Sequence, residues 1–135
     1  MRAFIVEIEN RPGSLADLCE ALGERGINIS GIAGSTWDDD GAVGLITNDD
    51  AATRSILESR DSDYRECDLV AAGLDDRPGA LGAAARRLAD AGVNIDAVMP
   101  TGMTAGRVMV TFAVDDAAKA REALGDLVSV ATSSI

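Results

Sequence analysis

Alternating apolar and polar positions open the chain and predict its first strand. Phe4, Val6 and Ile8 are separated by Ile5 and Glu7, and a repeat of two residues indicates a strand with one buried face. We therefore expect this segment to lie in a sheet with one side turned toward a core.

The pattern then changes to a helical one. Leu15, Leu18, Cys19 and Leu22 recur at positions i, i+3, i+4 and i+7, which places them in one apolar stripe along a helix. Gly26 follows the stripe, and glycine at this position is typical of the left-handed residue that ends a helix. The sequence therefore predicts a helix that buries this stripe and ends just before Gly26.

Two strands, a second helix and a last strand complete this half of the chain. Residues 27–36 (INISGIAGST) and 42–47 (AVGLIT) are apolar runs, and the turn-forming residues 38–41 (DDDG) lie between them. The Asp-Asp pair at 49–50 opens an alanine-rich segment, and acidic residues at a helix start bind its free amides. A strand at about residues 64–68 follows.

The whole pattern occurs a second time, 66 residues further along the chain. Residues 9–29 (ENRPGSLADLCEALGERGINI) correspond to residues 75–95 (DDRPGALGAAARRLADAGVNI), and residues 49–52 match residues 115–118 at the same offset without a gap. The second copy keeps the helical stripe and its terminal glycine at Leu81, Ala84, Ala85, Leu88 and Gly92. The matches fall at turn and core positions, which indicates two copies of one fold.

Each copy is expected to form a ferredoxin-like unit of the α+β class. The order strand-helix-strand-strand-helix-strand predicts a four-stranded antiparallel sheet with two helices on one face. We assign the units to residues 1–67 and 68–135, with the last strand at residues 127–131. Residues 64–76 (YRECDLVAAGLDD) have no turn residue before Gly73, so we expect one extended segment to end the first copy and begin the second.

The turn after the first strand of each copy resembles the signature of the ACT domain, a family of small ligand-binding modules. The first copy carries Asn10-Arg11-Pro12-Gly13-Ser14-Leu15 and then Gly26-Ile27-Asn28-Ile29, and the second carries Asp76-Arg77-Pro78-Gly79-Ala80-Leu81 and then Gly92-Val93-Asn94-Ile95. The resemblance covers nearly the whole chain, which is similar to stand-alone tandem ACT proteins without a catalytic domain.

This resemblance implies one ligand site in each copy and a homodimer. ACT domains bind small effectors, usually amino acids, at interfaces between domains, through the turn before the first helix and the strand that follows it. The ligand-binding residues implied here are Asn10, Arg11, Pro12, Gly13, Ser14, Leu15, Asn28 and Ile29 in the first copy, and Asp76, Arg77, Pro78, Gly79, Ala80, Leu81, Asn94 and Ile95 in the second. The homodimer follows from the paired sheets of the family and from the small core of each unit.

The chemistry of the turn residues fits an α-amino acid. A helix N-terminus offers free N–H groups and the positive end of the helix dipole to a carboxylate. Gly13 and Gly79 have no Cβ that would hold a ligand away from the backbone, and the side chains of Asn10 and Asp76 can accept hydrogen bonds from an α-ammonium group. Asn10 stands where the family more often has Asp, so equal affinity of the two sites is not expected.

Purely structural roles are the alternative. Asn10 and Asp76 can instead cap the helices that follow them, and Asn28 and Asn94 can instead hold the turn before a strand. On this alternative the protein is a scaffold with empty sites that acts through contact with a protein partner.

Composition argues against several other functions. The net charge of −11 and the sequence pI of about 4.2 disfavour binding to nucleic-acid phosphates and to anionic membranes. The chain has no histidine, so the commonest general base and metal ligand is missing, and residues 38–40 lack the spacing of a calcium loop. We therefore expect no metal, no cofactor and no catalysis. An acylphosphatase-like enzyme is the strongest enzymatic alternative, but Pro12 removes an amide where a phosphate-binding loop needs one.

Two observations indicate a cytoplasmic location. Cys19 and Cys67 form no CxxC motif, which is typical of reduced, unreactive thiols. Charged residues occur early and no long apolar run follows them, so we expect neither a signal peptide nor a membrane span. The sequence thus predicts a cytoplasmic regulatory protein with an amino-acid effector and a regulated enzyme as the partner that such a module implies.

Overall fold

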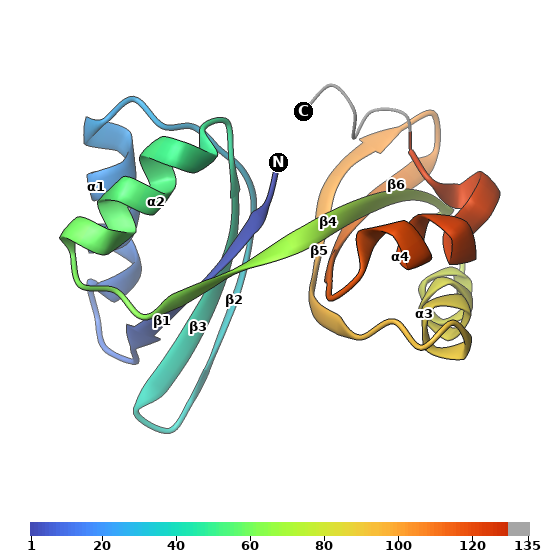
Figure 1. The fold of residues 1–135 in the computed structure, drawn as a ribbon, viewed down its shortest axis with the longest axis horizontal. Helices are drawn as coiled ribbons and strands as arrows, with labels where there is room; N and C mark the ends of the chain where they lie inside the picture. Colours follow the sequence, from blue (N-terminus) through green and yellow to red (C-terminus); the bar gives the residue numbers. More distant parts are fainter. Residues whose placement is uncertain (130–135) are drawn as a thin grey trace. The chain divides into compact units, whose positions relative to one another are not determined.

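The computed structural model describes residues 1–129 of the chain (Figure 1). The chain divides into two compact units, Met1–Glu66 and Cys67–Ile135. As far as α4 (Ala117–Leu124), strands and helices follow one another in the predicted order, and in each unit the helices lie on one face of the sheet. The α+β, ferredoxin-like fold class expected from the sequence is therefore confirmed.

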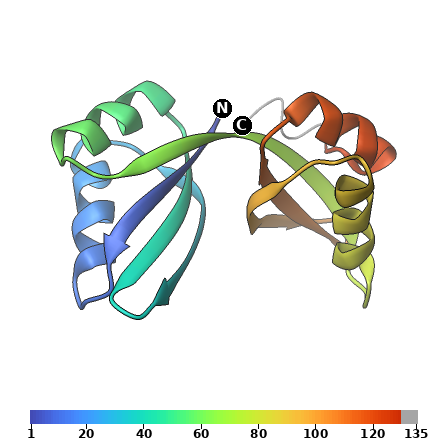
Figure 2. The same ribbon diagram turned by 60° about the horizontal axis from the view of Figure 1, so that its bottom comes forward.

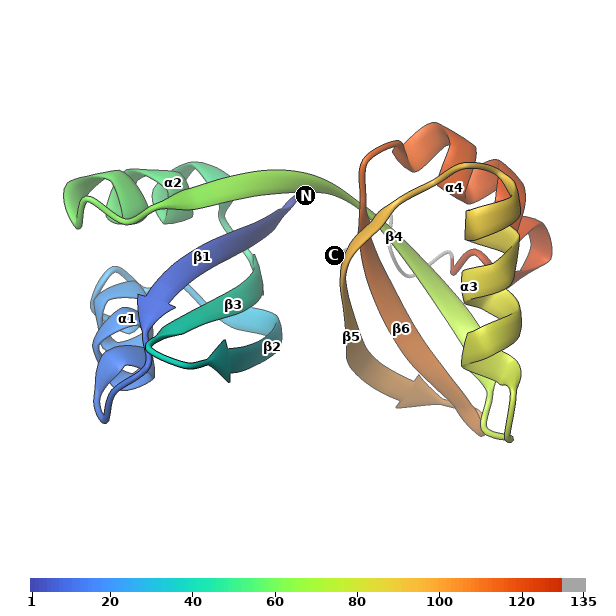
Figure 3. The same cartoon turned by 90° about the horizontal axis from the view of Figure 1, so that it is seen from below.

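The sheet of the first unit has β2 at its edge. The elements of this unit are β1 (Ala3–Glu9), α1 (Ser14–Glu24), β2 (Ile29–Trp37), β3 (Asp40–Thr47), α2 (Asp50–Ser59) and the beginning of β4 (Tyr64–Asp75). The strand order is β2-β3-β1-β4 (Figure 3), with β3 antiparallel to both β1 and β2. Among residues 1–129, no strand lies against the outer side of β2.

The core of the first unit lies between this sheet and its two helices. Phe4 pairs with Leu45 and Val6 with Val43, so these four side chains share one face of the sheet. The helices add Leu18, Leu22, Ile56 and Leu57 to the same buried cluster. The period-two pattern of the first strand therefore identifies its buried face.

The second unit repeats the arrangement and begins within a shared strand. It contains the rest of β4, α3 (Ala80–Asp90), β5 (Ile95–Thr104), β6 (Arg107–Val114), α4 (Ala117–Leu124) and a 3-10 helix (Gly125–Leu127). Its strand order is β4-β6-β5, and α3 and α4 cover one face (Figure 2). β4 is a single strand of 12 residues, so the prediction of one extended segment is confirmed.

The predicted last strand is only partly covered by the described residues. Leu127 lies in the 3-10 helix, so the expectation that the strand begins there is wrong. Val128 forms a bridge with Ala72, and the backbone N–H of Ser129 donates to the carbonyl of Ala71 at 2.9 Å. The chain thus lies against β4 at these two residues, on the side opposite β6. Residues 130 and 131 of the predicted strand lie outside the described part.

The two copies do not keep one gapless offset. Phe4 and Val70 occupy matching positions 66 residues apart, but their strand partners, Leu45 and Phe112, are 67 residues apart. The register of β5 shifts between Pro100 and Gly102, and a bulge there accommodates one extra residue. The predicted match of residues 49–52 with 115–118 is therefore wrong by one residue.

The N-caps of the second helices follow the corrected offset. The carboxylate of Asp49 accepts a hydrogen bond from the Ala52 amide at 2.9 Å, and that of Asp116 accepts one from the Lys119 amide at 3.0 Å. The predicted role of aspartate at these helix starts is confirmed, with Asp116 matching Asp49.

The first helices agree with the prediction at their ends but not at their beginnings. Gly26 and Gly92 follow α1 and α3 with φ angles of 71° and 75°, which is the left-handed conformation expected after a helix. Leu15 and Leu81 were expected in the buried stripe, yet they are 47% and 48% exposed. The first turn of each helix extends past the core, so its apolar side chain remains accessible.

The two cores differ in one polar pair. In the first unit, the hydroxyl groups of Thr47 and Thr53 are 2.7 Å apart and buried, and Thr53 also donates to the carbonyl of Asp49 at 2.8 Å. The matching residues of the second unit, Val114 and Ala120, are buried and apolar. The two units therefore fill the same core positions with different side chains, a hydrogen-bonded threonine pair in the first and two apolar residues in the second.

Within residues 1–129, no helix is long and apolar enough to cross a membrane. Among the described residues, neither Cys19 nor Cys67 forms a disulfide bond.

We predict that Asp49→Ala and Asp116→Ala each lower the free energy of unfolding by about 1 kcal/mol, because each removes a helix N-cap hydrogen bond. Urea unfolding followed by circular dichroism measures the change. Asp76→Ala is the matched control, since Asp76 is exposed and does not cap α3, and its expected effect is within about 0.5 kcal/mol. An equal loss in the control would contradict the assignment of the caps.

Candidate functional site

The turn between β1 and α1 leaves the start of the helix without a side-chain cap. Gly13 is the N-cap residue, with a φ of 94° in the left-handed region that favours glycine, and no side chain bonds to the first amides. The amide of Ser14 donates within the turn to the carbonyl of Arg11 at 3.3 Å, whereas the amides of Leu15 and Ala16 have no partner among the described residues. The helix start therefore presents free N–H groups and positive dipole charge.

Asn10 does not cap α1, and that part of the sequence prediction is wrong. Its side-chain amide donates to the carbonyl of Asp38 at 2.7 Å, and its backbone amide donates to the carbonyl of Asp39 at 2.9 Å. Asn10 lies too far ahead of Ser14, the first helical residue, to reach the helix amides as a cap. It fastens the turn to the β2–β3 hairpin instead.

A pocket of about 530 Å³ opens beside this turn, between the start of α1 and the edge strand β2. Four predicted site residues line it: Asn10, Arg11, Ser14 and Leu15. The strands contribute Ile8, Glu9, Val43 and residues 32–36. The pocket is thus lined by the turn, the start of α1 and residues of the strands β1, β2 and β3.

One polar atom in this pocket lacks a partner. The hydroxyl oxygen of Ser14 is buried and makes no hydrogen bond with any described residue. A buried hydroxyl without a partner is unfavourable by about 1–3 kcal/mol, and Ser14 lines both this pocket and a neighbouring one that includes Leu18 and Arg60. Ser14 lies at the same helix start as the free amides of Leu15 and Ala16.

The charged side chains of the pocket neutralise each other. Arg11 donates from Nε to the carboxylate of Glu9 at 2.8 Å, and a second carboxylate, that of Asp17, lies 4.0 Å from the Arg11 guanidinium. Glu9 and Arg11 are the ionisable residues that line the pocket. The pocket wall therefore carries no unpaired side-chain charge for a ligand to meet.

The second unit has the same turn. Gly79 is the N-cap residue of α3, with a φ of 88° and no side-chain cap. The Arg77 amide donates to the carbonyl of Asp75 at 2.8 Å, and the Ala80 amide donates to the carbonyl of Arg77 at 3.3 Å. Asp76, like Asn10, does not cap the helix, so both capping predictions are wrong for the same reason.

Comparison with known proteins identifies the duplicated unit. The sequence model of the ACT domain matches residues 3–61 and again residues 69–132. The two matches together span most of the chain and agree with the two structural units. The chain belongs to the ACT domain family.

Solved structures share this tandem ACT fold. Protein BT0572 from Bacteroides thetaiotaomicron aligns with a TM-score of 0.74 at 23% sequence identity, over 91% of this chain and 85% of that one. The regulatory subunit of aspartate kinase from Thermus thermophilus, in a ligand-free form, aligns with a TM-score of 0.67 at 18% identity, over 93% and 90%. The corresponding subunit from Thermus flavus has a TM-score of 0.66 at 20% identity, over 91% and 90%. No curated protein matches the chain in sequence.

The asparagine before the second strand of each ACT unit braces the sheet outside the pocket. The amide of Asn28 donates to the side chain of Asn48 at 2.9 Å, and its carbonyl accepts from the Asn48 amide at 3.1 Å. Asn94 forms the same pair of bonds with Asp115, at 3.0 and 3.3 Å. Both asparagines therefore join the start of an edge strand to the end of its neighbour.

The remaining predicted residues lie in the turns or in the cores. Pro12 lies in the turn that precedes α1, where the missing N–H of proline is tolerated, and Pro78 has the matching place before α3. Ile29 and Ile95 pack against the two core clusters. Their ligand-binding roles remain predictions, since they do not line the pocket described above.

Sequence reasoning named no residue of β2 beyond Ile29 as part of the site. Ile32, Gly34 and Thr36 line the pocket, and they alternate along the strand on the face that carries Leu45 and Val43. Their spacing of two was visible in the sequence. Which of the two faces of β2 meets the helix start, however, depends on its register with β3.

A second pocket of the first unit, about 550 Å³ in volume, has an acidic lining. It includes Glu7, Asp40, Asp61 and Asp63, with Trp37 beside them at 82% exposure. Among residues 1–129, no group of three or more histidine, cysteine, aspartate or glutamate side chains is arranged to hold a metal ion. The carboxylates of this pocket are thus dispersed around it.

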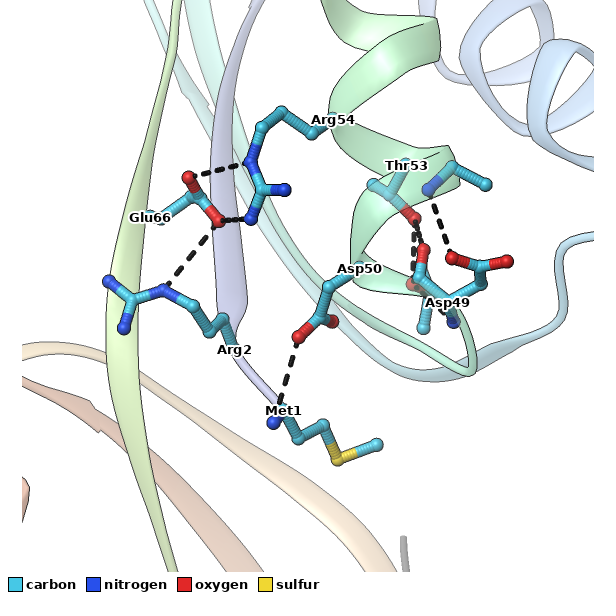
Figure 4. Close-up of polar contacts among 9 residues, drawn as sticks. Met1, Arg2, Asp49, Asp50, Thr53, Arg54 and Glu66 are labelled. Carbon is cyan, nitrogen blue, oxygen red and sulfur yellow. Dashed lines mark hydrogen bonds and ion pairs between the residues drawn. The ribbon is translucent and has the colours of Figure 1, made fainter.

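An ion-pair cluster lies apart from the pocket and joins α2 to the sheet (Figure 4). The carboxylate of Glu66 on β4 accepts from Nε of Arg54 on α2 at 3.0 Å, and Arg2 lies 3.6 Å from the same carboxylate. The hydrogen bond from Arg54 is the main reason that the pKa of Glu66 lies below its ordinary value. The N-terminal ammonium of Met1 pairs with Asp50 at 3.6 Å.

We predict that the cluster around Glu66 loses its stabilising effect in acid. Because the folded-state pKa of Glu66 is lowered, the contribution is complete above the unfolded-state pKa and is lost as the pH falls through the folded-state value. The difference in unfolding free energy between the wild type and Glu66→Gln should therefore shrink from about pH 7 to about pH 3. Glu20→Gln, at an exposed position of α1, should show no such trend. A difference for Glu66→Gln that stays constant with pH would contradict the ion-pair contribution.

Proposed function

We propose that the protein is a regulatory module that binds an amino acid in the pocket beside α1 and transmits binding through a change of conformation or assembly. The observation that carries this proposal is the buried, unpartnered hydroxyl of Ser14, next to the free amides of Leu15 and Ala16. Each of these groups could donate a hydrogen bond to the carboxylate of a ligand.

The rest of the pocket suits the other parts of an α-amino acid. The side-chain oxygen of Asn10 can accept a hydrogen bond from an α-ammonium group, because the Asn10 contact with Asp38 uses the side-chain nitrogen. Leu15 and Ile32 line the same pocket and are 47% and 42% exposed, so a ligand would remove apolar surface from water. Donors, an acceptor and an apolar wall are thus present together.

Two considerations favour regulation over catalysis. The ionisable residues that line the pocket, Glu9 and Arg11, pair with each other, which suits binding better than proton transfer. The Thermus structures with the same fold are regulatory subunits of aspartate kinase, and ACT domains are regulatory modules. A regulated enzyme is therefore the partner that we propose, without naming its reaction.

A homodimer is part of the proposal. In the described part of the chain, the edge strands β2 and β5 have a neighbouring strand on one side only, and exposed apolar side chains lie beside each of them. The exposed residues are Leu15 and Ile32 in the first unit and Leu81 and Val98 in the second. A second chain would cover this surface, and a ligand that contacts both chains would favour their joined arrangement.

We predict that a panel of the standard L-amino acids, each at millimolar concentration, contains a selective stabiliser of the protein. A ligand at about 100 times its dissociation constant adds about 2.7 kcal/mol to the stability of the folded state. For a small domain this corresponds to a rise in Tm of several degrees. A thermal-shift assay measures it.

Ser14→Ala should weaken this shift, because it removes a hydrogen-bonding group from the pocket wall. Ser55→Ala is the matched control, since Ser55 is exposed on α2 and does not line the pocket, and it should leave the shift unchanged. A flat panel with well-folded protein would reject the amino-acid proposal and favour the scaffold with empty sites.

We also predict that the protein elutes as a dimer at micromolar concentration. Size-exclusion chromatography with light scattering should give about twice the 13.9 kDa mass of one chain. A measured mass equal to one chain would reject the homodimer while leaving the ligand proposal standing.

A further inference from the structure

We infer that the first unit alone holds the amino acid, so that one chain binds one ligand, and that the side chain of this ligand is uncharged. This inference rests on the proposed function and adds to it the number of sites and the class of ligand. It follows from differences between the two edge strands, β2 and β5, and between the starts of the two helices α1 and α3.

Two hydroxyl groups of the first pocket have no counterpart in the second unit. Ser14 provides the unpartnered hydroxyl, and the matching residue at the start of α3 is Ala80. Thr36 pairs with Gly41 on β3, and its match, Met103, pairs with Val108 on β6. Among the described residues, the amides of Leu81 and Gly82 at the start of α3 have no partner, but the counterparts of these two hydroxyl groups are missing beside them.

The space beside the edge strand also differs between the two units. Gly34 lines the first pocket and pairs with Val43, whereas Pro100 occupies the same register opposite Val110. A proline ring thus stands where the first unit has no side chain. The bulge that follows Pro100 inserts Thr101 into the strand. Such a bulge bends the strand and changes the direction of the side chains that follow. A ligand pose that fits against β2 would meet additional atoms against β5.

The ion pairs around the two turns also differ between the units. In the first unit, one arginine, Arg11, lies 2.8 Å from Glu9 and 4.0 Å from Asp17. In the second unit, Asp75 lies 3.6 Å from Arg77 and 3.7 Å from Arg107, and Arg107 also donates to the carbonyl of Gly73 at 2.8 Å. Arg107 is thus held at the end of β4, and two arginines share the carboxylate of Asp75.

The class of ligand follows from the wall of the first pocket. Its ionisable residues are already paired, and Leu15, Ile32 and Val43 form its apolar part. The α-carboxylate and α-ammonium of an amino acid have their own partners in the helix amides and in Asn10. A further charge on the ligand side chain would find no unpaired opposite charge among the lining residues, whereas an apolar side chain would cover Leu15 and Ile32. An apolar or hydroxyl side chain needs no such opposite charge.

The test is a calorimetric titration of the full chain with the amino acid that gives the largest thermal shift in the panel. We expect one molecule bound per chain, and we expect this amino acid to have an uncharged side chain. The double variant Ser14→Ala/Ile32→Ala should bind at least about tenfold more weakly, because it removes a hydrogen bond to a charged group and an apolar contact.

Val98→Ala is the matched control in the second unit. Val98 and Ile32 are both 42% exposed, and residue 80 is already alanine, so this single change gives the second unit the same two truncations. Because Val98 also lies on the surface proposed for the homodimer, light scattering first establishes that the variant keeps the wild-type mass. Binding and stoichiometry should then stay at wild-type values. Circular dichroism and Tm without ligand confirm that both variants are folded.

The possible outcomes separate this inference from the proposed function. Two molecules per chain, a loss of affinity in Val98→Ala, or a strongest response to a charged amino acid would each overturn the inference while leaving amino-acid binding established. A flat panel would reject both. One molecule per chain, lost only with the first-unit variant, would support the single site.

Discussion

The left-handed conformation of Gly13 determines how α1 begins, and the candidate site depends on it. A helix start has amides that its own backbone cannot satisfy, and α2 and α4 satisfy part of theirs with Asp49 and Asp116. Gly13 has no side chain to offer, and Asn10 is engaged with the β2–β3 hairpin. Hydrogen-bonding capacity therefore remains available at one helix end of the unit, where the edge strand supplies a wall.

The duplication kept this backbone arrangement and changed the side chains around it. Gly79 repeats the conformation of Gly13, and the asparagines at 28 and 94 brace their edge strands through the same pair of bonds. Ser14 and Gly34, by contrast, correspond to Ala80 and Pro100. The backbone of a turn can thus be retained for folding while the chemistry beside it diverges. For this reason, two copies of one motif do not by themselves mean two equal sites.

The ACT family match and the solved structures agree with the fold of this chain. Identities of 18–23% with those structures establish a common fold, and the case for a ligand rests on the atoms of this chain. A neutral pocket wall, a buried hydroxyl without a partner and free helix amides form a set of groups that a zwitterion can satisfy. The acidic pocket near Trp37 and the ion pairs around Glu66 lie outside that set.

The sequence by itself determined the repeat, the fold class, the order of the elements, the shared strand β4 and the glycines that end α1 and α3. These features follow from local rules: residue periodicity, the conformational freedom of glycine and the capping preference of aspartate. Only the tertiary structure decided that Asn10 binds Asp38 rather than the helix, that Leu15 is exposed, and that Ile32, Gly34 and Thr36 face the start of α1. Each of these depends on strand register and on contacts between residues distant in sequence, and a single inserted residue in β5 changes which side chains a strand presents.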